Sequence, residues 1–247
     1  MGYLITHIEE LSLNAWASLH TFLYDGWVIC FSDGYTKRAN SVNPLYPSTV
    51  DIDEKISFCE NLYENKNMAV IFKITSAAYP RYLDERLNKI GYRKDSPVSV
   101  KTADLESAEL FPASEVNLNE NLSDEWLENF CRMNSVEGQN RRTLKKILLN
   151  ILPEHRFVSV KSDGNIIACG LGVLQSGYIG LFDIVTDKDF RNRGYGGKIV
   201  SNLLAWGKQN NAKKAYLQVT LDNMTAINLY SKIGFVEEYQ YWYRIKA

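Results

Sequence analysis

The sequence has few of the residues from which metal sites and disulfide frameworks are built. Its 247 residues include only 4 cysteines and 3 histidines. The cysteines, at positions 30, 59, 131 and 169, form no CxxC pair and have no histidine at ligand spacing. Closely spaced Cys and His mark zinc sites, and dense cysteine marks disulfide scaffolds. The pattern predicts no metal and four free thiols in a reducing cytoplasm.

An excess of charge is also missing. Lys and Arg total 28 and Asp and Glu total 29, which gives a formal net charge of −1. Binding to nucleic acid needs a basic patch, so the composition predicts no nucleic-acid partner. No apolar run approaches the roughly 20 residues that cross a bilayer, and the first ten residues lack the pattern of a secretory signal. We therefore expect no membrane association and a cytoplasmic location.

The remaining composition is that of a folded globular protein, with 45% hydrophobic and 12% aromatic residues. A chain of 247 residues exceeds the usual domain length of about 100–200 residues, which favours two domains. A polar stretch from about Lys101 to Glu120 is the predicted connector. The predicted domains are residues 1–110 and 111–247.

The second half alternates strand and helix patterns. An Asp163-Gly164 pair separates two β-branched apolar runs, which is a strong hairpin signal, and a third run follows. Helical spacing then begins near Gly194, and Ser123 is a predicted helix N-cap further upstream. The expected strands are 156–161, 165–174, 178–186, 215–221 and 237–246, and the expected helices are 123–133, 144–151, 194–206 and 223–232.

The order βββ-α-β-α-β after two helices predicts an α/β (α+β) fold with a mixed, mostly antiparallel, twisted sheet flanked by helices. The first half shows strand patterns at 27–31, 36–42, 69–75 and 96–100 and helix patterns at 53–64 and 80–90. Its strand at 69–75, its helix at 80–90 and Gly91 parallel the strand and helix that end at Gly234. We interpret the first half as a degenerate structural repeat of the second.

The segment Arg191-Asn192-Arg193-Gly194-Tyr195-Gly196-Gly197 lies between a predicted strand and a predicted helix. The first N–H groups of a helix lack intrahelical partners and, with the helix dipole, attract anions. Glycine lets a pyrophosphate approach the backbone closely. The segment predicts a phosphate-binding loop, and a simple tight turn is the alternative.

A second polar group of residues follows on one helical face. Asn223, Ala226 and Tyr230 are spaced to share that face, with the small alanine between an amide and a phenol. Such a face can contact one extended ligand. The alternatives are a helix N-cap for Asn223 and a core residue for Tyr230.

Together these segments resemble the GNAT superfamily of acetyl-CoA-dependent N-acetyltransferases over about residues 115–247. The motif Arg/Gln-x-x-Gly-x-Gly/Ala is met by Arg191, Gly194 and Gly196. The resemblance implies that the loop holds the pyrophosphate of coenzyme A, that Asn223 contacts the pantetheine and that Tyr230 is the general acid near the sulfur. It also implies that the preceding strand pairs with the pantetheine arm through the backbone of Ile184, Val185 and Thr186.

One position departs from a related pattern. The segment that begins at Leu181 is similar to the bacterial enzymes that acetylate ribosomal-protein N-termini, but Gln218 stands where those enzymes carry a glutamate base. Glutamine cannot serve as that base, so this substrate class is not predicted. Asp183 is the nearest candidate base in the sequence, and a water chain is the alternative.

The first half has no glycine-rich loop before a helix, so we expect one coenzyme site per chain. Its segment from Trp27 to Val42 is similar to a motif of tandem-type GNAT proteins with a non-catalytic N-terminal half. Trp27, Arg38 and Asn40 are therefore candidate substrate residues. A solvated strand face with a buried Trp27 is the alternative.

The sequence thus predicts an acyltransferase, a GNAT N-acetyltransferase in which a primary amine of a small molecule or peptide attacks acetyl-CoA directly. Acetyl-CoA and the acceptor are its expected partners, and the chain is expected to be a monomer or a homodimer. Two alternatives stay open: a coenzyme A-binding regulatory module without transfer, and transfer of a longer acyl group.

Overall fold

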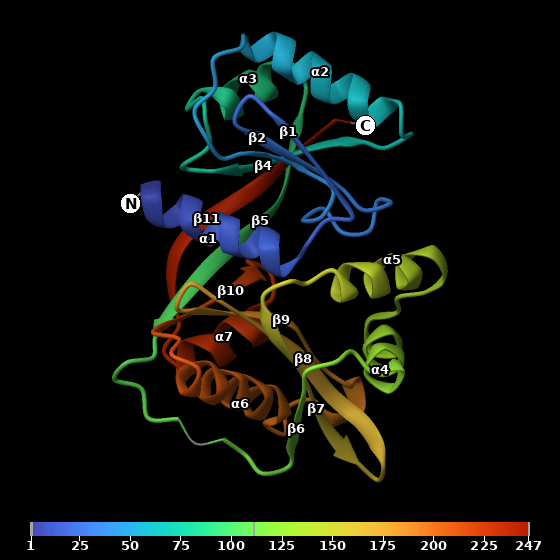
Figure 1. Cartoon of the computed structure of the whole chain (residues 1–247), viewed down its shortest axis with the longest axis vertical. Helices are drawn as coiled ribbons and strands as arrows, with labels where there is room; N and C mark the ends of the chain where they lie inside the picture. Colours follow the sequence, from blue (N-terminus) through green and yellow to red (C-terminus); the bar gives the residue numbers. More distant parts are fainter. Residues whose placement is uncertain (1, 111, 247) are drawn as a thin grey trace. The chain divides into compact units, whose positions relative to one another are not determined.

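A computed structural model describes residues 2–110 and 112–246 of the chain (Figure 1). Contacts divide the described residues into a first unit, residues 2–99 and 239–246, and a second unit, residues 100–238. The terminal segment from Tyr239 thus belongs to the first unit. The predicted domains, 1–110 and 111–247, stay a prediction.

The sheet of the second unit has the strand order β10-β9-β8-β7-β6. Strands β6 to β9 pair antiparallel, and β9 pairs parallel with β10. Left-handed backbone at Asp163 and Gly164 makes the predicted hairpin between β7 and β8. The elements are β6 (Val116–Asn119), α4 (Asp124–Asn134), α5 (Gly138–Leu149), β7 (Glu154–Ser162), β8 (Asn165–Gln175), β9 (Tyr178–Thr186), the 3₁₀ helix η1 (Lys188–Phe190), α6 (Tyr195–Gln209), β10 (Lys214–Thr220) and α7 (Met224–Lys232).

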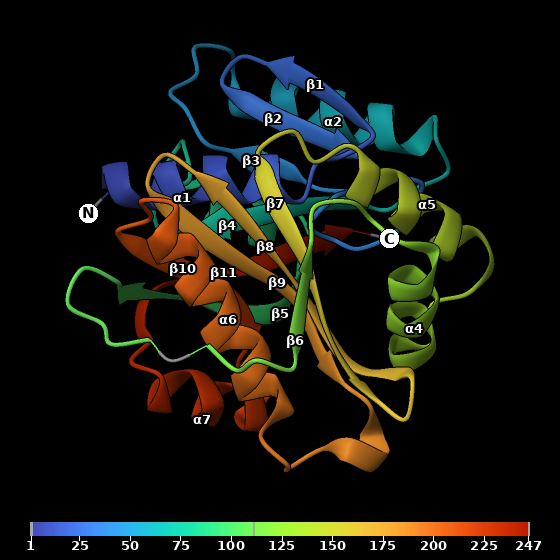
Figure 2. The same cartoon turned by 60° about the horizontal axis from the view of Figure 1, so that its bottom comes forward.

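Helices α6 and α4 cover opposite faces of this sheet (Figure 2). A side chain at Gly172 would meet Leu203 of α6 at 2.6 Å, so glycine permits the close packing of α6 on β8. On the other face, the ring of Trp126 from α4 packs edge-on against Phe157, with centroids 5.1 Å apart. Ser123 caps α4 as predicted, since its hydroxyl accepts from the N–H of Trp126.

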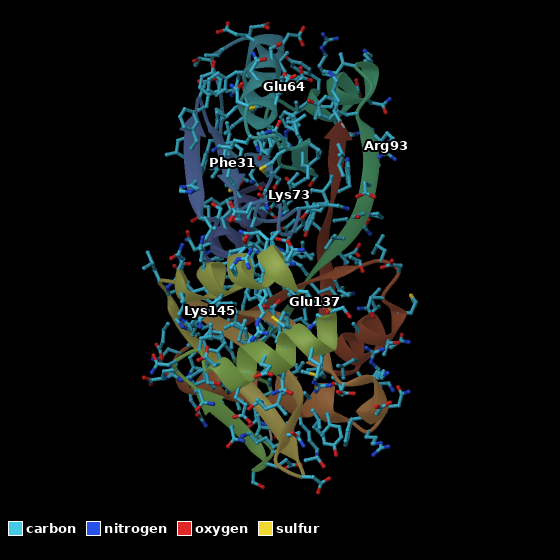
Figure 3. All side chains as sticks on the ribbon, turned by 90° about the vertical axis from the view of Figure 1, so that its right-hand side faces the viewer. Phe31, Glu64, Lys73, Arg93, Glu137 and Lys145 are labelled. Carbon is cyan, nitrogen blue, oxygen red and sulfur yellow. The ribbon has the colours of Figure 1, made fainter. Side chains whose placement is uncertain are left out.

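The first unit has the strand order β1-β2-β3-β4-β11. Strand β11 pairs antiparallel with β4, from Tyr241 opposite Thr75 to Lys246 opposite Val70. Lys73 on β4 is labelled in Figure 3. The elements are α1 (Gly2–Ala15), β1 (His20–Tyr24), β2 (Trp27–Phe31), β3 (Val42–Pro44), α2 (Ile52–Glu64), β4 (Val70–Thr75), α3 (Leu83–Lys89), β5 (Arg93–Asp104) and β11 (Val236–Lys246), of which β5 and β11 have residues in both units.

The fold class and the order βββ-α-β-α-β are confirmed. One expectation was wrong. The stretch 36–41 is no strand, because Thr36 has a left-handed backbone and the Asn40 amide bonds the surrounding loop. Within the predicted connector, β5 extends to Asp104 and β6 begins at Val116.

Candidate active site

Strands β9 and β10 separate at the predicted cofactor site. Their residue pairing ends at Leu181 and Leu217, although β9 continues to Thr186 and β10 to Thr220. On its other side, β9 stays paired with β8 as far as Thr186. Among the described residues, no strand therefore pairs with the β10-facing edge of Ile184, Val185 and Thr186, and such an edge can bind an extended ligand.

A β-bulge accompanies this separation. Opposite β8, the pairing steps from Phe182 to Val185 while β8 advances by only two residues, so β9 carries one extra residue. Asp183 within the bulge has a left-handed backbone, φ 53°. Bulges bend and twist the strand that contains them, which accounts for the divergence of β9 from β10. Gln218 is the first residue of β10 beyond the paired region.

The phosphate-loop segment ends at an uncapped helix. Gly194 is the N-cap of α6 in a left-handed conformation, φ 84°, and no side chain caps the helix. The first bond that the N-cap carbonyl accepts comes from the N–H of Lys198, at 3.1 Å. The preceding N–H groups of Tyr195, Gly196 and Gly197 are those that an α-helix leaves without an intrahelical acceptor. This end of α6 fits an anion.

Two arginines flank this helix end. Arg191 donates from Nε to the carbonyl of Thr186 at 3.2 Å, which ties the loop back to β9. Arg193 lies with its guanidinium 5.3 Å from the centroid of the Phe190 ring. Arg191, Asn192 and Arg193 are all exposed, so their side chains can contact a phosphate in solvent.

Helix α7 presents the second predicted group. Asn223 is its N-cap and accepts from the N–H of Ala226 at 3.1 Å, so the alternative structural role is present. That bond uses the amide oxygen and leaves the side-chain N–H groups for a ligand. Ala226 is half-buried and packs against the core of the unit.

Tyr230 of α7 is buried, at 8% exposure, and packs edge-on against Phe235. Burial raises the pKa of its phenol to about 12. No described residue forms a recorded hydrogen bond with the hydroxyl. A phenol that stays protonated at neutral pH and has no protein acceptor is suited to donate its proton to a ligand.

Asp183 lies close to Cys169. Burial, and then the charge of Asp183, hold the pKa of the Cys169 thiol well above its usual range. The neighbouring Ile184 points the other way, because a side chain at Gly170 would meet both Ile184 and Ile199 of α6. Asp183, the predicted base, thus lies on the part of β9 that diverges from β10.

The predicted substrate residues of the first unit differ in their surroundings. Trp27 is fully buried, and its indole N–H donates to the carbonyl of Tyr79. Asn40 is 2% exposed and bonds its own loop through both amide atoms. Arg38 is half-buried, with Cζ 5.6 Å from the centroid of the Trp16 ring. These contacts give Trp27 and Asn40 structural roles, and substrate binding by the three residues stays a prediction.

Arg132 and Asp187, which no sequence motif singles out, form an ion pair beside the start of the loop. An aspartate directly before a short helical turn is an N-cap signal that can be read from sequence, but its partner on α4 cannot.

The described residues contain no group of three or more metal-ligating side chains. None of their helices is long and apolar enough to span a bilayer.

Comparisons with known proteins identify the family. A family model described as "Probable histone acetyltransferase Rv0428c C-terminal" matches residues 4–244. The "Uncharacterized N-acetyltransferase YobR" of Bacillus subtilis (strain 168) is 29% identical over 253 residues, which cover 98% of each chain.

Two solved structures share the fold. A GCN5-related N-acetyltransferase from Kribbella flavida has a TM-score of 0.70 at 14% identity and covers 98% of this chain and 95% of its own. A tandem GNAT protein from the clavulanic acid biosynthesis pathway has a TM-score of 0.67 at 10% identity, with coverages of 97% and 87%. The chain therefore belongs to the Rv0428c C-terminal family, within the GNAT superfamily of N-acetyltransferases, and is an acyltransferase.

Proposed function

We propose that this N-acetyltransferase transfers an acetyl group from acetyl-CoA to a primary amine of a small molecule or peptide. The observation that carries the proposal is the arrangement at the end of β9. On the side of β10, the edge of β9 at Ile184, Val185 and Thr186 pairs with no strand among the described residues, and it runs directly into the loop that leads to the uncapped end of α6. An extended pantetheine with a pyrophosphate at its far end matches an edge followed by an anion site.

In this proposal the backbone of Ile184, Val185 and Thr186 binds the pantetheine. The N–H groups of the α6 end and the flanking arginines bind the pyrophosphate, and Asn223 and Ala226 contact the arm from α7. The cofactor-binding residues of the loop are Arg191, Asn192, Arg193, Gly194, Tyr195, Gly196 and Gly197.

The chemistry is direct attack. The neutral amine forms a bond to the thioester carbonyl carbon, the carbon–sulfur bond breaks, and the amide product and coenzyme A leave. Positioning of the two reactants supplies much of the rate. Tyr230 donates its proton to the departing sulfur, and Asp183 accepts the proton that the amine loses. A backbone N–H of β9 near Ile184 stabilises the negative charge that develops on the carbonyl oxygen.

The proposed reaction takes place in the cytoplasm. Its acceptor belongs to the class of primary amines, which includes lysine side chains, because the matched family is described as a probable histone acetyltransferase. The degenerate domain of the proposal is residues 1–110, and its Trp27, Arg38 and Asn40 bind the acceptor.

A release assay for coenzyme A thiol tests the function. Acetyl-CoA is combined with peptides, aminoglycosides, polyamines or amino acids, and acetylated product is identified by mass. Turnover with one amine class supports transfer. Tight coenzyme A binding without turnover across the panel points to a binding module instead. Faster turnover with succinyl-CoA or longer thioesters assigns a longer acyl group.

Calorimetry of coenzyme A tests the predicted stoichiometry of one site per chain. The second unit alone has the glycine-rich helix start among the described residues, so one equivalent should saturate the protein. Two equivalent sites would contradict the proposal.

A further inference from the structure

Asp187 organises the turn at the start of the phosphate loop. Its N–H donates to the carbonyl of Ile167 on β8 at 2.8 Å. Its Oδ1 accepts from the N–H of Asp189 at 3.2 Å, and its carbonyl accepts from the N–H of Phe190 at 2.9 Å. The carboxylate side chain is only 11% exposed. The position at which the chain leaves the sheet is therefore fixed around this residue.

Arg132 joins this turn to helix α4. Its Nη1 donates to Asp187 Oδ2, and its Nη2 donates to the carbonyl of Ile166 at 3.3 Å and to Asn129 Oδ1 at 3.3 Å. One guanidinium thus connects α4, β8 and the loop. Arg132 is also in the last turn of α4, where a positive charge interacts favourably with the helix dipole.

The pair is charged and partly exposed, since the Arg132 side chain is 51% exposed and that of Asp187 is 11% exposed. Hydrogen bonds from Arg132 and from the N–H of Asp189 hold the pKa of Asp187 below its usual range, so the carboxylate is ionised at neutral pH. Removal of Arg132 would leave the Asp187 carboxylate without its countercharge and without the hydrogen bond that joins it to α4. Removal of the Asp187 side chain would take away the acceptor for the N–H of Asp189 and the partner of Arg132.

Beyond Asp187, the described residues of the loop are largely exposed. Residues from Arg191 to Gly194 are exposed, and Asn192 and Gly194 have left-handed backbones. The bond from Arg191 to the carbonyl of Thr186 holds the loop from within the same segment. Arg132 adds a contact from helix α4, which is distant in sequence, at the start of the loop.

We propose that Arg132 and Asp187 are positioning residues that fix the phosphate loop in its pyrophosphate-binding conformation. The inference rests on the proposed function of that loop. Neither residue needs to touch the pyrophosphate. They act through the start of the loop, so their loss should weaken coenzyme A binding more than it slows the reaction of the bound complex.

The experiment compares Asp187→Asn and Arg132→Met with the wild type in three measurements. These are the Kd of coenzyme A by calorimetry, the separate kcat and KM for acetyl-CoA, and hydrogen exchange of residues 191–197 without ligand. Asp187→Asn keeps an acceptor for the N–H of Asp189 and loses the charge. We expect Kd and KM to rise about tenfold, the effect of one charge-assisted hydrogen bond, with kcat within about twofold and faster exchange in the loop.

Control variants test whether the effect is specific to the Arg132–Asp187 pair. Lys145→Met breaks an exposed ion pair with Asp124, 2.8 Å long, between α5 and α4, and should leave coenzyme A binding unchanged (Figure 3 labels Lys145). Arg132→Lys keeps the charge and should recover part of the affinity. The double variant of Arg132→Met and Asp187→Asn should bind no more weakly than the weaker single variant, because the two groups act as one unit.

The outcomes separate the two proposals. If the wild type does not bind coenzyme A, the proposed function fails. If the wild type binds and Asp187→Asn, with an unchanged melting temperature, binds equally well, the positioning inference is overturned. Reduced affinity at an unchanged melting temperature supports it. If Arg132→Met does not fold, Asp187→Asn and Arg132→Lys decide the question.

Discussion

Gly196 and Leu229 bring the phosphate loop against helix α7. A side-chain carbon at Gly196 would lie 3.3 Å from Leu229 Cδ2, whereas one at Gly197 would lie at an ordinary 3.6 Å from Cδ1. The absence of a side chain at Gly196 therefore serves packing as well as the proposed approach of a pyrophosphate to the backbone. Mutations can separate packing against Leu229 from the proposed binding of the pyrophosphate.

Gly196→Val should weaken coenzyme A binding by about tenfold or more, because its side chain occupies the approach to the helix end. Gly197→Val is the matched comparison and should weaken binding less, because a side-chain carbon there lies at an ordinary distance from Leu229. To isolate crowding, the coenzyme A affinity of Gly196→Ala is compared by calorimetry with that of the double variant Gly196→Ala and Leu229→Ala. If the double variant recovers affinity, crowding against Leu229 caused the loss. If it does not, the loss arises from the blocked approach of the ligand.

Asn223 has both a capping bond and a proposed ligand contact, which different substitutions distinguish. Asn223→Asp keeps the oxygen that accepts from the Ala226 N–H and removes the side-chain N–H donors. It should raise the KM for acetyl-CoA about threefold or more at an unchanged melting temperature. Asn223→Ala should also destabilise the protein by about 1 kcal/mol. Equal KM values for Asn223→Asp and the wild type would leave capping as its role.

Local features of the sequence predicted most of the second unit. The hairpin at Asp163 and the start of α6 depend on neighbouring residues, whose turn and capping preferences are visible in one segment. The separation of β9 from β10 could not be predicted in this way. It depends on the bulge at Asp183, which only the pairing with β8 reveals.

The first unit was harder to predict for the same reason. Alternating polarity suggested that Asn40 faces a ligand, but its amide bonds the backbone around it. The terminal strand was expected in the second half, yet residues from Tyr241 pair with β4 of the first unit. Such pairing joins segments that are distant in sequence, and the strand pattern of either segment does not specify its partner.

Arg244 anchors that terminal strand to α3. Its guanidinium donates to both oxygens of Asp84, at 2.8 and 3.1 Å, and to Asn88 Oδ1 at 2.8 Å. Loss of one partner of a fully buried pair costs about 3–5 kcal/mol. Because the Asp84 side chain is 28% exposed, we expect Arg244→Ala to lower the free energy of unfolding by about 2 kcal/mol. Urea unfolding at pH 7 measures this.

The same pair predicts the acid dependence of stability. Burial favours a higher pKa for Asp84, but hydrogen bonds from Arg244 and Trp242 lower the pKa below its ordinary 3.8. A depressed carboxyl pKa contributes stability above the unfolded value, which is lost as the pH falls through the folded value. Arg244→Ala should therefore lose less stability than the wild type between pH 4 and pH 2. Parallel acid profiles would contradict this.

Arg38 tests the proposed role of the first unit. Its guanidinium is half-buried over Trp16, and its charge opposes the rise that burial causes in the pKa of Tyr243. If it contacts the acceptor, Arg38→Ala should raise the acceptor KM about tenfold or more and leave acetyl-CoA affinity near that of the wild type. Arg38→Lys should show a smaller effect. Equal losses for both ligands would indicate a folding role.

Removal of the hydroxyl oxygen of Tyr230 distinguishes a catalytic role from a packing role. Tyr230→Phe keeps the ring that packs against Phe235. No described residue forms a hydrogen bond with the hydroxyl, so the melting temperature should change little. If the phenol is the general acid, kcat at saturating acetyl-CoA should fall by about 10²–10⁴-fold with little change in coenzyme A affinity.

The pH dependence of the wild type adds an independent test of Tyr230. Burial raises the pKa of the phenol to about 12, so the proton donor persists well above the ordinary value of 10. The stability gained by keeping the phenol neutral is complete below pH 10 and is lost as the pH rises through about 12. The rate should show no loss from phenol ionisation at pH 10, where an exposed tyrosine would be half ionised. Full activity of Tyr230→Phe would instead assign Tyr230 to the core, and would favour departure of the thiolate without a proton donor.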